Sequence, residues 1–421
     1  MKTTALRLYG KNDLRLESFE LPEIKDNEVL ASVVTDSVCM STYKATLQGS
    51  EHKRVPKNVS SNPIIVGHEQ CGTILQVGNK LKDKFKVGMK YSVQPAVNYP
   101  GRETEAVGYS YRYVGGDATT VIIPSEVIEM DCLIPYAGDS FYNASLSEPI
   151  SCILGALNSQ FHEKPNAYAH EMGIKNNGCL ALLGGAGPMG LGFVDLLLNG
   201  RRKPRLLVVT DIDNVRLNRA EKLFPREEAS KKGVRLEFIN SSGKDALRNI
   251  VEPTSNAGYD DIFVMVPVPA VAEQASQLLG YDGCLNIFAG PTDKAFGAFV
   301  NLYQVHYNKH HIMGTTGGNA ADMREALDLI GRGLINPAVM ITHVGGLDSA
   351  SETIKNLPKI PGGKKLIYTG ISLPLTAIDD FERKGATKPL FKELALIINN
   401  TRGIWSKEAE DYLLRNAETI N

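Results

Sequence analysis

Near the middle of the chain the sequence reads Cys179-Leu180-Ala181-Leu182-Leu183-Gly184-Gly185-Ala186-Gly187-Pro188-Met189-Gly190. An apolar strand therefore runs directly into a glycine-rich turn and a helix, with the pattern G-x-G-x-x-G at Gly185, Gly187 and Gly190. Gly185 permits the tight turn, Gly187 lets backbone amides approach a pyrophosphate, and Gly190 lets the helix pack close to the strand. Because the helix N-terminus adds unpaired N–H groups and a positive dipole end, the stretch predicts a dinucleotide-binding site.

The next apolar run, Leu206–Thr210, is followed by Asp211, at about the separation expected for a ribose-binding acid. A carboxylate there accepts hydrogen bonds from the ribose hydroxyls and repels a 2′-phosphate, so Asp211 favours NAD over NADP. Asp213 and Arg216 lie close by in the sequence and could moderate this preference. They could equally be a solvated helix start with an i,i+3 ion pair.

From about residue 148 onward, apolar strands alternate with helical segments, which predicts a doubly wound parallel sheet with helices on both faces, an α/β Rossmann domain. The expected strands are Cys179–Leu183, Leu206–Thr210, Arg235–Ile239, Asp261–Val266, Cys284–Phe288 and His311–Gly314, and the expected helices are Met189–Asn199, Asn214–Leu223, Lys244–Val251, Ala270–Leu279 and Ala320–Gly331.

The N-terminal part, to about residue 147, has short alternating or β-branched runs punctuated by glycine, which is typical of an irregular β-rich domain. The segment from residue 341 to about 368 is too short for a core of its own and is expected to fold back onto that first domain. The sequence thus predicts one domain from residues 1–150 and 334–421 and a second from residues 151–333. A helix-like run at 389–398 marks the tail, whose position the sequence does not indicate.

Composition excludes several classes of protein. The chain has 421 residues, with 46 Lys and Arg against 47 Asp and Glu and a pI near 6.7, so a general electrostatic grip on nucleic acid or anionic lipid is not expected. The N-terminus becomes charged before a signal-peptide core can build, and the most apolar stretch, 179–198, is interrupted by five glycines, a proline and an aspartate. We therefore expect a cytoplasmic enzyme without a membrane span. Six cysteines, scattered singly, predict no disulfide framework.

Potential metal ligands stand in the β-rich part at Cys39, at Gly67-His68-Glu69 and at Glu148-Pro149. A catalytic zinc commonly takes three such protein ligands and keeps one exchangeable position. Taken singly, each residue is more often structural, because isolated cysteines and histidines are usual core residues. Their joint appearance ahead of a dinucleotide turn is what favours a catalytic metal site.

The ordered set of Cys39, Gly67-His68-Glu69, Gly115-Gly116-Asp117-Ala118, Glu148-Pro149, the glycine turn and Asp211 resembles the zinc-dependent medium-chain dehydrogenase/reductase family, polyol dehydrogenase type, over roughly residues 1–370. The resemblance implies a GroES-like catalytic domain and a Rossmann coenzyme domain. It also implies a small-molecule alcohol or ketone substrate and assembly into homodimers or homotetramers.

Carried over residue by residue, the resemblance makes Cys39, His68 and Glu148 ligands of a catalytic zinc, with Glu69 either a ligand or adjacent to it. Ser41 would hydrogen-bond the substrate oxygen and pass its proton outward, but an acid and a relay histidine usual nearby are replaced, with Lys44 close to the latter's place, so the route beyond Ser41 stays open. Residues 94–117 lack the four cysteines of a structural zinc lobe, which predicts one catalytic zinc and no structural zinc. The resemblance also places Val266, Gly314 and Thr315 beside the nicotinamide, and the full set of expected coenzyme contacts is Gly185, Gly187, Pro188, Met189, Gly190, Asp211, Val266, Gly314 and Thr315.

The metal set, the missing cysteine lobe and the long tail most resemble the branch of polyol dehydrogenases that acts on sorbose phosphate, which implies reduction of L-sorbose 1-phosphate to D-glucitol 6-phosphate. Candidate cations for the phosphate are Lys44, Arg112 and Lys309-His310-His311, each of which could instead be solvated. The alternatives are a dehydrogenase of an unphosphorylated polyol or secondary alcohol, a non-catalytic dinucleotide-binding protein, and a zinc-free reductase of the same fold.

Overall fold

A computed structural model describes residues 1–420 of the chain, which separates into two compact units. The first unit contains Met1–Pro149, Asn319–Arg332 and the chain from Ile341 onward, and the second contains Ile150–Gly318 and Gly333–Met340. Within residues 1–420, no helix combines the length and the apolar character that crossing a bilayer requires.

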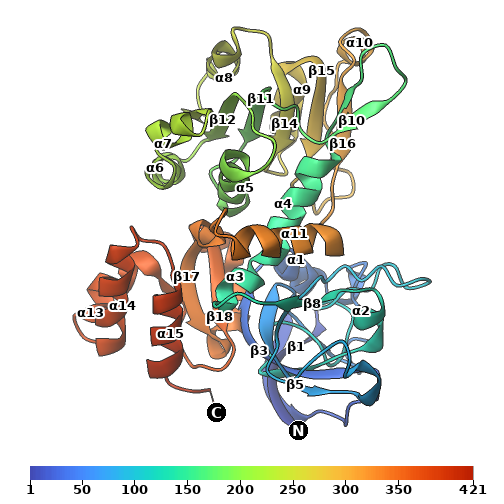
Figure 1. Ribbon diagram of the computed structural model, residues 1–421, viewed down its shortest axis with the longest axis vertical. Helices are drawn as coiled ribbons and strands as arrows, with labels where there is room; N and C mark the ends of the chain where they lie inside the picture. Colours follow the sequence, from blue (N-terminus) through green and yellow to red (C-terminus); the bar gives the residue numbers. More distant parts are fainter. Residues whose placement is uncertain (421) are drawn as a thin grey trace. The chain divides into compact units, whose positions relative to one another are not determined.

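The second unit contains a six-stranded parallel sheet in the order β13-β12-β11-β14-β15-β16 (Figure 1). Counted among the strands of this sheet alone, the order is 3-2-1-4-5-6, the Rossmann order, in which the switch point lies between β11 and β14. The strands are β11 (Cys179–Leu183), β12 (Leu206–Asp211), β13 (Arg235–Asn240), β14 (Tyr259–Val264), β15 (Leu279–Ile287) and β16 (His311–Gly314). The helices are α5 (Pro188–Asn199), α6 (Asn214–Leu223), α7 (Arg226–Lys231), α8 (Ala246–Val251), α9 (Pro269–Leu278) and α10 (Leu302–Tyr307).

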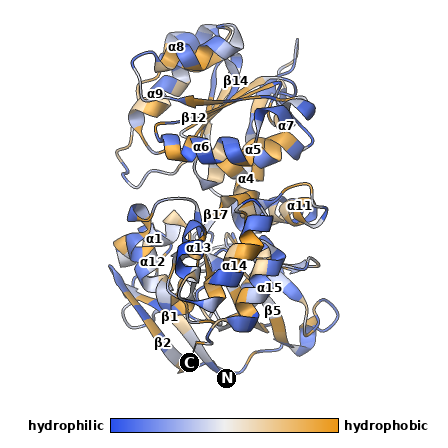
Figure 2. Cartoon of the chain, turned by 90° about the vertical axis from the view of Figure 1, so that its left-hand side faces the viewer, coloured by the Kyte–Doolittle hydropathy of each residue, from blue (hydrophilic) through white to orange (hydrophobic). Residues whose placement is uncertain are grey.

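The predicted α/β Rossmann fold is confirmed, with small differences at element ends. Strand β14 stops at Val264, so Val266 lies beyond it, and β15 begins at Leu279, directly after α9. Strand β11 is buried along its whole length, as expected for a central parallel strand covered on both faces. Figure 2 shows hydrophobic residues in the strands, whereas helices such as α5 and α6 carry both hydrophobic and hydrophilic residues.

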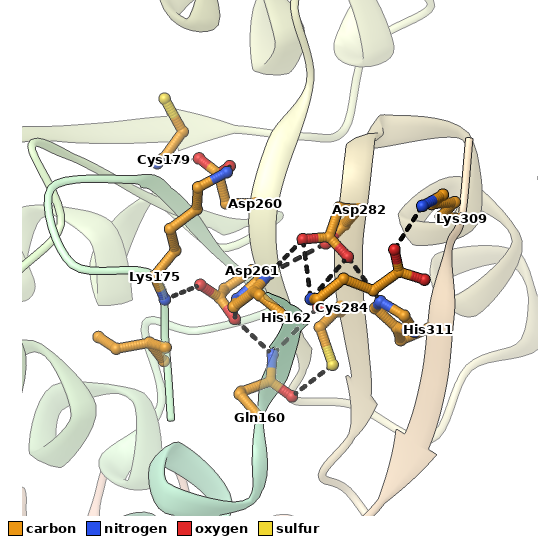
Figure 3. A network of polar contacts seen from close by, with 12 residues as sticks. Gln160, His162, Lys175, Cys179, Asp260, Asp261, Asp282, Cys284, Lys309 and His311 are labelled. Atoms are coloured by element: carbon orange, nitrogen blue, oxygen red, sulfur yellow. Dashed lines mark hydrogen bonds and ion pairs between the residues drawn. The ribbon is translucent and has the colours of Figure 1, made fainter. Parts of the chain in front are cut away.

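A short hairpin of β9 (Phe161–Glu163) and β10 (His170–Met172) is attached to the sheet of the second unit by a polar network (Figure 3). His162 Nε2 lies 3.2 Å from Asp261 Oδ1, and its Nδ1 lies 2.9 Å from the Asp282 carbonyl. His311 Nε2 lies 2.8 Å from Asp282 Oδ1. Since Asp261 lies on β14 and Asp282 on β15, the contacts of His162 hold the hairpin against these two strands.

The first unit is built on an eight-stranded sheet with the path β19-β17-β18-β3-β5-β6-β8, and β7 also pairs with β3. These strands are β3 (Val29–Ser37), β5 (Gln70–Val77), β6 (Lys90–Val93), β7 (Thr120–Ile123), β8 (Leu133–Tyr136), β17 (Ile341–Gly346), β18 (Lys364–Tyr368) and β19 (Thr376–Ala377). A smaller sheet pairs β1 (Lys2–Gly10) with β2 (Asp13–Glu20) and β4 (Ile64–Ile65). Because β18 pairs with β3, the segment after residue 341 does fold back onto the N-terminal strands.

Helices complete the first unit and include the C-terminal tail. The run at 389–398 is helical, and it packs with two neighbouring helices beside β17 and β18 (Figure 1). The helices of the unit are α1 (Met40–Gln48), α2 (Ser125–Glu129), α3 (Phe141–Ser145), α4 (Ser147–Ser159, which continues into the second unit), α11 (Ala320–Gly331), α12 (Ala350–Asn356), α13 (Phe381–Gly385), α14 (Pro389–Asn400) and α15 (Lys407–Asn416).

Candidate metal and coenzyme sites

Three of the four expected metal ligands lie together in the first unit. Ligand atoms of Cys39, His68 and Glu69 all lie within 4.8 Å of one another, with His68 and Glu69 buried and Cys39 half-buried. Cys39 occupies the position just before helix α1, while His68 and Glu69 lie between β4 and β5. A thiol, an imidazole and a carboxylate within this distance form a donor set that suits zinc.

A strained turn positions His68 and Glu69. Gly67 has φ of +87°, and a Cβ at that position would lie 2.6 Å from the backbone nitrogen of Asp117. The Glu69 N–H then donates to Asp36 Oδ1 at 2.8 Å, which fixes the turn against strand β3. Only glycine fits this turn, because a side chain would meet both an unfavourable φ and the neighbouring backbone.

Both carboxylate oxygens of Glu69 already accept hydrogen bonds in this site. Ser37 Oγ donates to Oε2, and Lys364 Nζ donates to Oε1. Burial acts to lower the pKa of Lys364, but the charges of Glu69 and Cys39 outweigh it and leave that pKa raised. Lys364 therefore stays charged and forms a buried ion pair with Glu69. The sequence analysis missed Lys364, although two consecutive lysines at the start of the run Lys364-Lys365-Leu366-Ile367-Tyr368 were a signal that could have identified it.

The fourth expected ligand, Glu148, lies in the first turn of α4 and is buried. Among residues 1–420, Glu148 is not part of the group of ligand atoms that lie within 4.8 Å of one another. Its charge nevertheless acts to raise the pKa of His68, against the effect of burial. Burial, and then the charge of Glu69, raise the pKa of Glu148 to about 7. Because burial disfavours the charged form of this carboxylate, Glu148 is a candidate partner for a cation.

Ser41 joins the metal cluster to a buried tyrosine. Ser41 Oγ donates to Cys39 Sγ at 3.0 Å and lies 3.3 Å from His68 Nε2. Tyr109 Oη donates to Ser41 Oγ at 2.7 Å. Since Thr42 Oγ1 lies 3.2 Å from His68 Nδ1, it can accept the proton of that nitrogen and leave the Nε2 lone pair directed at the cluster. Tyr109 was not singled out as a site residue, because the sequence separates it from Ser41 by 68 positions.

The cations considered for a phosphate group have different surroundings. Lys44 is half-buried on α1, three residues after Ser41. Arg112 is exposed and lies with its guanidinium carbon 5.2 Å from the Tyr113 ring. Lys309, in the second unit, forms an ion pair with Glu163 there, and His310 and His311 belong to the same unit.

The glycine turn of the second unit has the geometry that dinucleotide binding requires. A Cβ at Gly190 would lie 1.8 Å from the Gly185 carbonyl oxygen, so the helix can approach the strand only with glycine there. A Cβ at Gly187 would meet no atom within 4 Å, which leaves open space next to the α5 N-terminus. Gly187 precedes α5, and Pro188 and Met189 form its first turn. This opening is where a pyrophosphate would receive backbone N–H groups.

The other expected coenzyme contacts lie at the carboxyl ends of strands in the same sheet. Asp211 ends β12, is buried, and accepts a hydrogen bond from the Asp213 N–H at 3.1 Å. Val266 follows β14, Gly314 ends β16, and the Thr315 hydroxyl donates to Asn286 Oδ1 at 3.3 Å. Ligands of open α/β sheets bind at this edge, so these residues stand where a dinucleotide would be expected to bind.

Together, the Rossmann unit and the cluster of a half-buried cysteine with a buried histidine and a buried carboxylate define a metal-dependent nucleotide-linked oxidoreductase. The zinc-binding dehydrogenase profile matches residues 207–332, and the alcohol dehydrogenase GroES-like domain profile matches residues 25–131. The chain belongs to the zinc-binding dehydrogenase family and is an oxidoreductase of the alcohol and polyol dehydrogenase type. This membership confirms the predicted enzyme class over the non-catalytic and zinc-free alternatives.

Two relatives match nearly the whole chain. The chain is 49% identical over 414 residues to mannitol-1-phosphate 5-dehydrogenase of Aliivibrio fischeri, covering 98% of this chain and 97% of the relative. It is 46% identical over 419 residues to L-sorbose 1-phosphate reductase of Klebsiella pneumoniae, covering 99% and 98%. The crystal structure of 2R,3R-butanediol dehydrogenase from Bacillus subtilis has the same fold, with 22% identity, a TM-score of 0.69, and coverage of 87% of this chain and 99% of that chain.

Proposed function

We propose that this protein is a zinc-dependent reductase of a ketose phosphate, which reduces L-sorbose 1-phosphate to D-glucitol 6-phosphate with NADH. The observation that carries the proposal is the buried cluster of Cys39, His68 and Glu69 in a chain that is 46% identical to an L-sorbose 1-phosphate reductase over nearly its whole length. The polyol phosphate and NAD would be the substrates of the reverse reaction.

The donor set fits one zinc ion, and we assign Cys39, His68 and Glu148 as its ligands. Glu69 is closer to the first two, but binding through its carboxylate would disrupt a buried ion pair with Lys364 and a bond from Ser37, which is costly. Two anionic ligands also balance the charge of one Zn²⁺, while Glu69 balances Lys364. A bound zinc ion would polarise the substrate carbonyl and stabilise the negative charge that develops on its oxygen during hydride transfer.

Ser41 can donate the proton, and Tyr109 positions Ser41. The Ser41 hydroxyl is placed within hydrogen-bond distance of Cys39 and His68 and can donate to an alkoxide formed beside them. Tyr109 orients the Ser41 hydroxyl through its 2.7 Å hydrogen bond to Ser41. Burial raises the pKa of Tyr109 well above its usual range, so Tyr109 acts as a neutral donor.

We propose that the second unit binds the coenzyme through its glycine turn, with Asp211 favouring NAD over NADP. The buried Asp211 carboxylate at the end of β12 would oppose a 2′-phosphate. The Arg216 side chain, which could favour NADP, lies 3.7 Å from Asp213 and is partly neutralised by it. Both features support NAD.

A second candidate is the oxidation of a hexitol 1-phosphate at carbon 5, because the mannitol-1-phosphate 5-dehydrogenase of A. fischeri is 49% identical to this chain. The two candidates differ in where the phosphate stands relative to the reacting carbon. In a 2-ketose 1-phosphate it is on the neighbouring carbon, whereas in the hexitol it is at the opposite end of the chain.

Steady-state kinetics on the zinc-loaded protein test both candidates. We expect L-sorbose 1-phosphate to be reduced with NADH at a kcat/KM at least about tenfold above that for free L-sorbose, since one charge-assisted phosphate contact is worth roughly 1.5–3 kcal/mol. Higher efficiency on mannitol 1-phosphate would favour the second candidate. Equal efficiency on free and phosphorylated sugars would refute both and favour a dehydrogenase of an unphosphorylated polyol.

Three further expectations remain predictions. They are one catalytic zinc per chain without a structural zinc, a homodimer or homotetramer, and a cytoplasmic location. Elemental analysis, sedimentation and fractionation would test them. The domain limits expected from the sequence, 1–150 with 334–421 and 151–333, are also a proposal, which limited proteolysis can test.

A further inference from the structure

The ring of Tyr109 is surrounded by side chains that the proposed reaction has not used. It is buried, and its centroid lies 5.0 Å from that of the ligand His68. His52 stacks on it at 5.7 Å with an interplanar angle of 14°. The guanidinium carbon of Arg54 lies 5.4 Å from the same ring centroid. Arg54 is therefore one aromatic ring away from the metal cluster.

Arg54 is held in place by its backbone. The Arg54 carbonyl accepts a hydrogen bond from Ser110 Oγ at 2.7 Å, and its N–H donates to His52 Nδ1 at 3.3 Å. The next residue, Val55, is buried in the same hydrophobic cluster as Tyr109. These two hydrogen bonds and the burial of Val55 fix the backbone at Arg54, so its side chain starts from a defined position beside Tyr109. Less conformational entropy is then lost when the side chain binds a ligand.

The charges that act on His52, which stacks on the same ring, are positive. Among residues 1–420, no carboxylate forms an ion pair with the Arg54 guanidinium. Lys44 lies on the same face of α1 as Ser41, since three residues separate them. Burial, followed by the charges of Arg54, Lys53 and Lys44, lowers the pKa of His52 to about 4. His52 is consequently neutral at pH 7, and the positive field comes from the arginine and the lysines.

We propose that Arg54, together with Lys44, binds the phosphate group of the ketose phosphate substrate. The inference rests on the proposed function and adds a specific subsite to it. A phosphate monoester carries about −1.5 to −2 charges at pH 7, and a planar guanidinium can donate two parallel hydrogen bonds to it. In a 2-ketose 1-phosphate the phosphate is attached next to the carbonyl carbon, so its cations must lie near the metal ligands, as Arg54 and Lys44 do.

Arg112 and Lys309 fit this role less well than Arg54. Arg112 is exposed and stacks on Tyr113, and Lys309 is paired with Glu163 in the second unit. An exposed or already paired cation gains little from a phosphate, because it must give up solvent or a carboxylate first. Arg54 was overlooked in the sequence because it lies in an irregular segment between η1 (Gly49–Glu51) and β4.

The test compares Arg54→Gln with Lys53→Gln, which removes the same charge from the exposed neighbouring residue. For each zinc-loaded protein the ratio of kcat/KM for L-sorbose 1-phosphate to that for free L-sorbose is measured. We expect Arg54→Gln to lower this ratio roughly 10- to 150-fold and Arg54→Lys to restore part of it. Lys53→Gln should leave the ratio within about threefold, as expected for a screened surface charge.

Competitive inhibition by inorganic phosphate provides a second measurement. Arg54→Gln should raise its inhibition constant by a factor similar to the loss of preference, while Lys53→Gln should not. If the wild-type protein prefers the phosphorylated sugar and Arg54→Gln keeps that preference, the subsite is wrong and the proposed function stands. Equal effects of the two variants would also overturn it, because a general positive field would then suffice. Absence of any preference in the wild type would refute the proposed function itself.

Discussion

Replacing Glu410 by glutamine should remove a pH-dependent part of the stability of the first unit. Glu410 lies on α15 and is completely buried. Its carboxylate accepts hydrogen bonds from the N–H groups of Phe141 and Tyr142 at 2.7 and 2.9 Å, and from Tyr368 Oη at 3.0 Å. The C-terminal tail is thereby joined to the start of α3 and to the end of β18, two elements that lead to Glu148 and Lys364.

The expected magnitude follows from the protonation of this carboxyl group. Burial raises the pKa of Glu410 to about 7, although its hydrogen bonds oppose the shift, whereas in the unfolded chain it titrates near 4.5. Between these values the folded protein binds more protons than the unfolded one, so the free energy of unfolding falls as the pH rises. Each unit of pKa difference is worth about 1.4 kcal/mol, which gives a loss of about 2–3 kcal/mol between pH 5 and pH 8.

Trp405 provides the assay because it is the single tryptophan of the chain, is buried, and donates from Nε1 to Tyr368 Oη at 2.8 Å. Its fluorescence therefore reports on the network around Glu410 during urea unfolding at pH 5, 6, 7 and 8. Relative to wild type, Glu410→Gln should gain about 2–3 kcal/mol between pH 5 and pH 8, because the amide does not titrate. Glu408→Gln, an identical change at an exposed position of the same helix, should follow the wild-type pH dependence.

Two results would contradict this reasoning. If Glu410→Gln and wild type lose stability in parallel from pH 5 to pH 8, then Glu410 does not titrate in that range. If wild type gains stability relative to the variant as the pH rises, then the hydrogen bonds outweigh burial and the sign of the shift is wrong. Glu410→Ala, which leaves two buried N–H donors without an acceptor, should cost roughly 2–6 kcal/mol at pH 8 if the hydrogen bonds form as described.

Four further substitutions test the two sites. Glu148→Gln should lose most of the bound zinc, whereas Glu69→Gln should keep it with an affinity about 10- to 100-fold lower; chelator competition and elemental analysis decide, and the reverse order would exchange the two roles. Asp211→Ser should shift the ratio of kcat/KM values roughly tenfold toward NADPH, and an unchanged ratio would show that another residue sets the preference. Gly67→Ala should destabilise the protein by about 1–3 kcal/mol in calorimetry, because its φ of +87° and the 2.6 Å approach to the Asp117 nitrogen leave no room for a Cβ.

The sequence by itself determined the features that depend on neighbouring residues. The strand, glycine turn and helix from Cys179 onward identified the Rossmann fold, because the required backbone conformations and packing distances are local. Hydrophobic periodicity located the six parallel strands within a few residues for the same reason. Cys39 and His68 were recognised as candidate ligands only through the resemblance to a family in which residues of these types occur in the same order.

Only the tertiary structure decided which distant residues complete the sites. Lys364 reaches Glu69 across 295 positions because β18 pairs with β3, a register that no local pattern specifies. Glu410 caps a helix 268 and 269 positions earlier, although the sequence indicated only that the tail was helical. Arg54 became a candidate phosphate ligand only because the structure places it beside the ring of Tyr109, which belongs to another loop. The sequence can indicate that a charged or amphipathic residue requires an interaction partner. Which residue becomes the partner depends on how the whole unit packs.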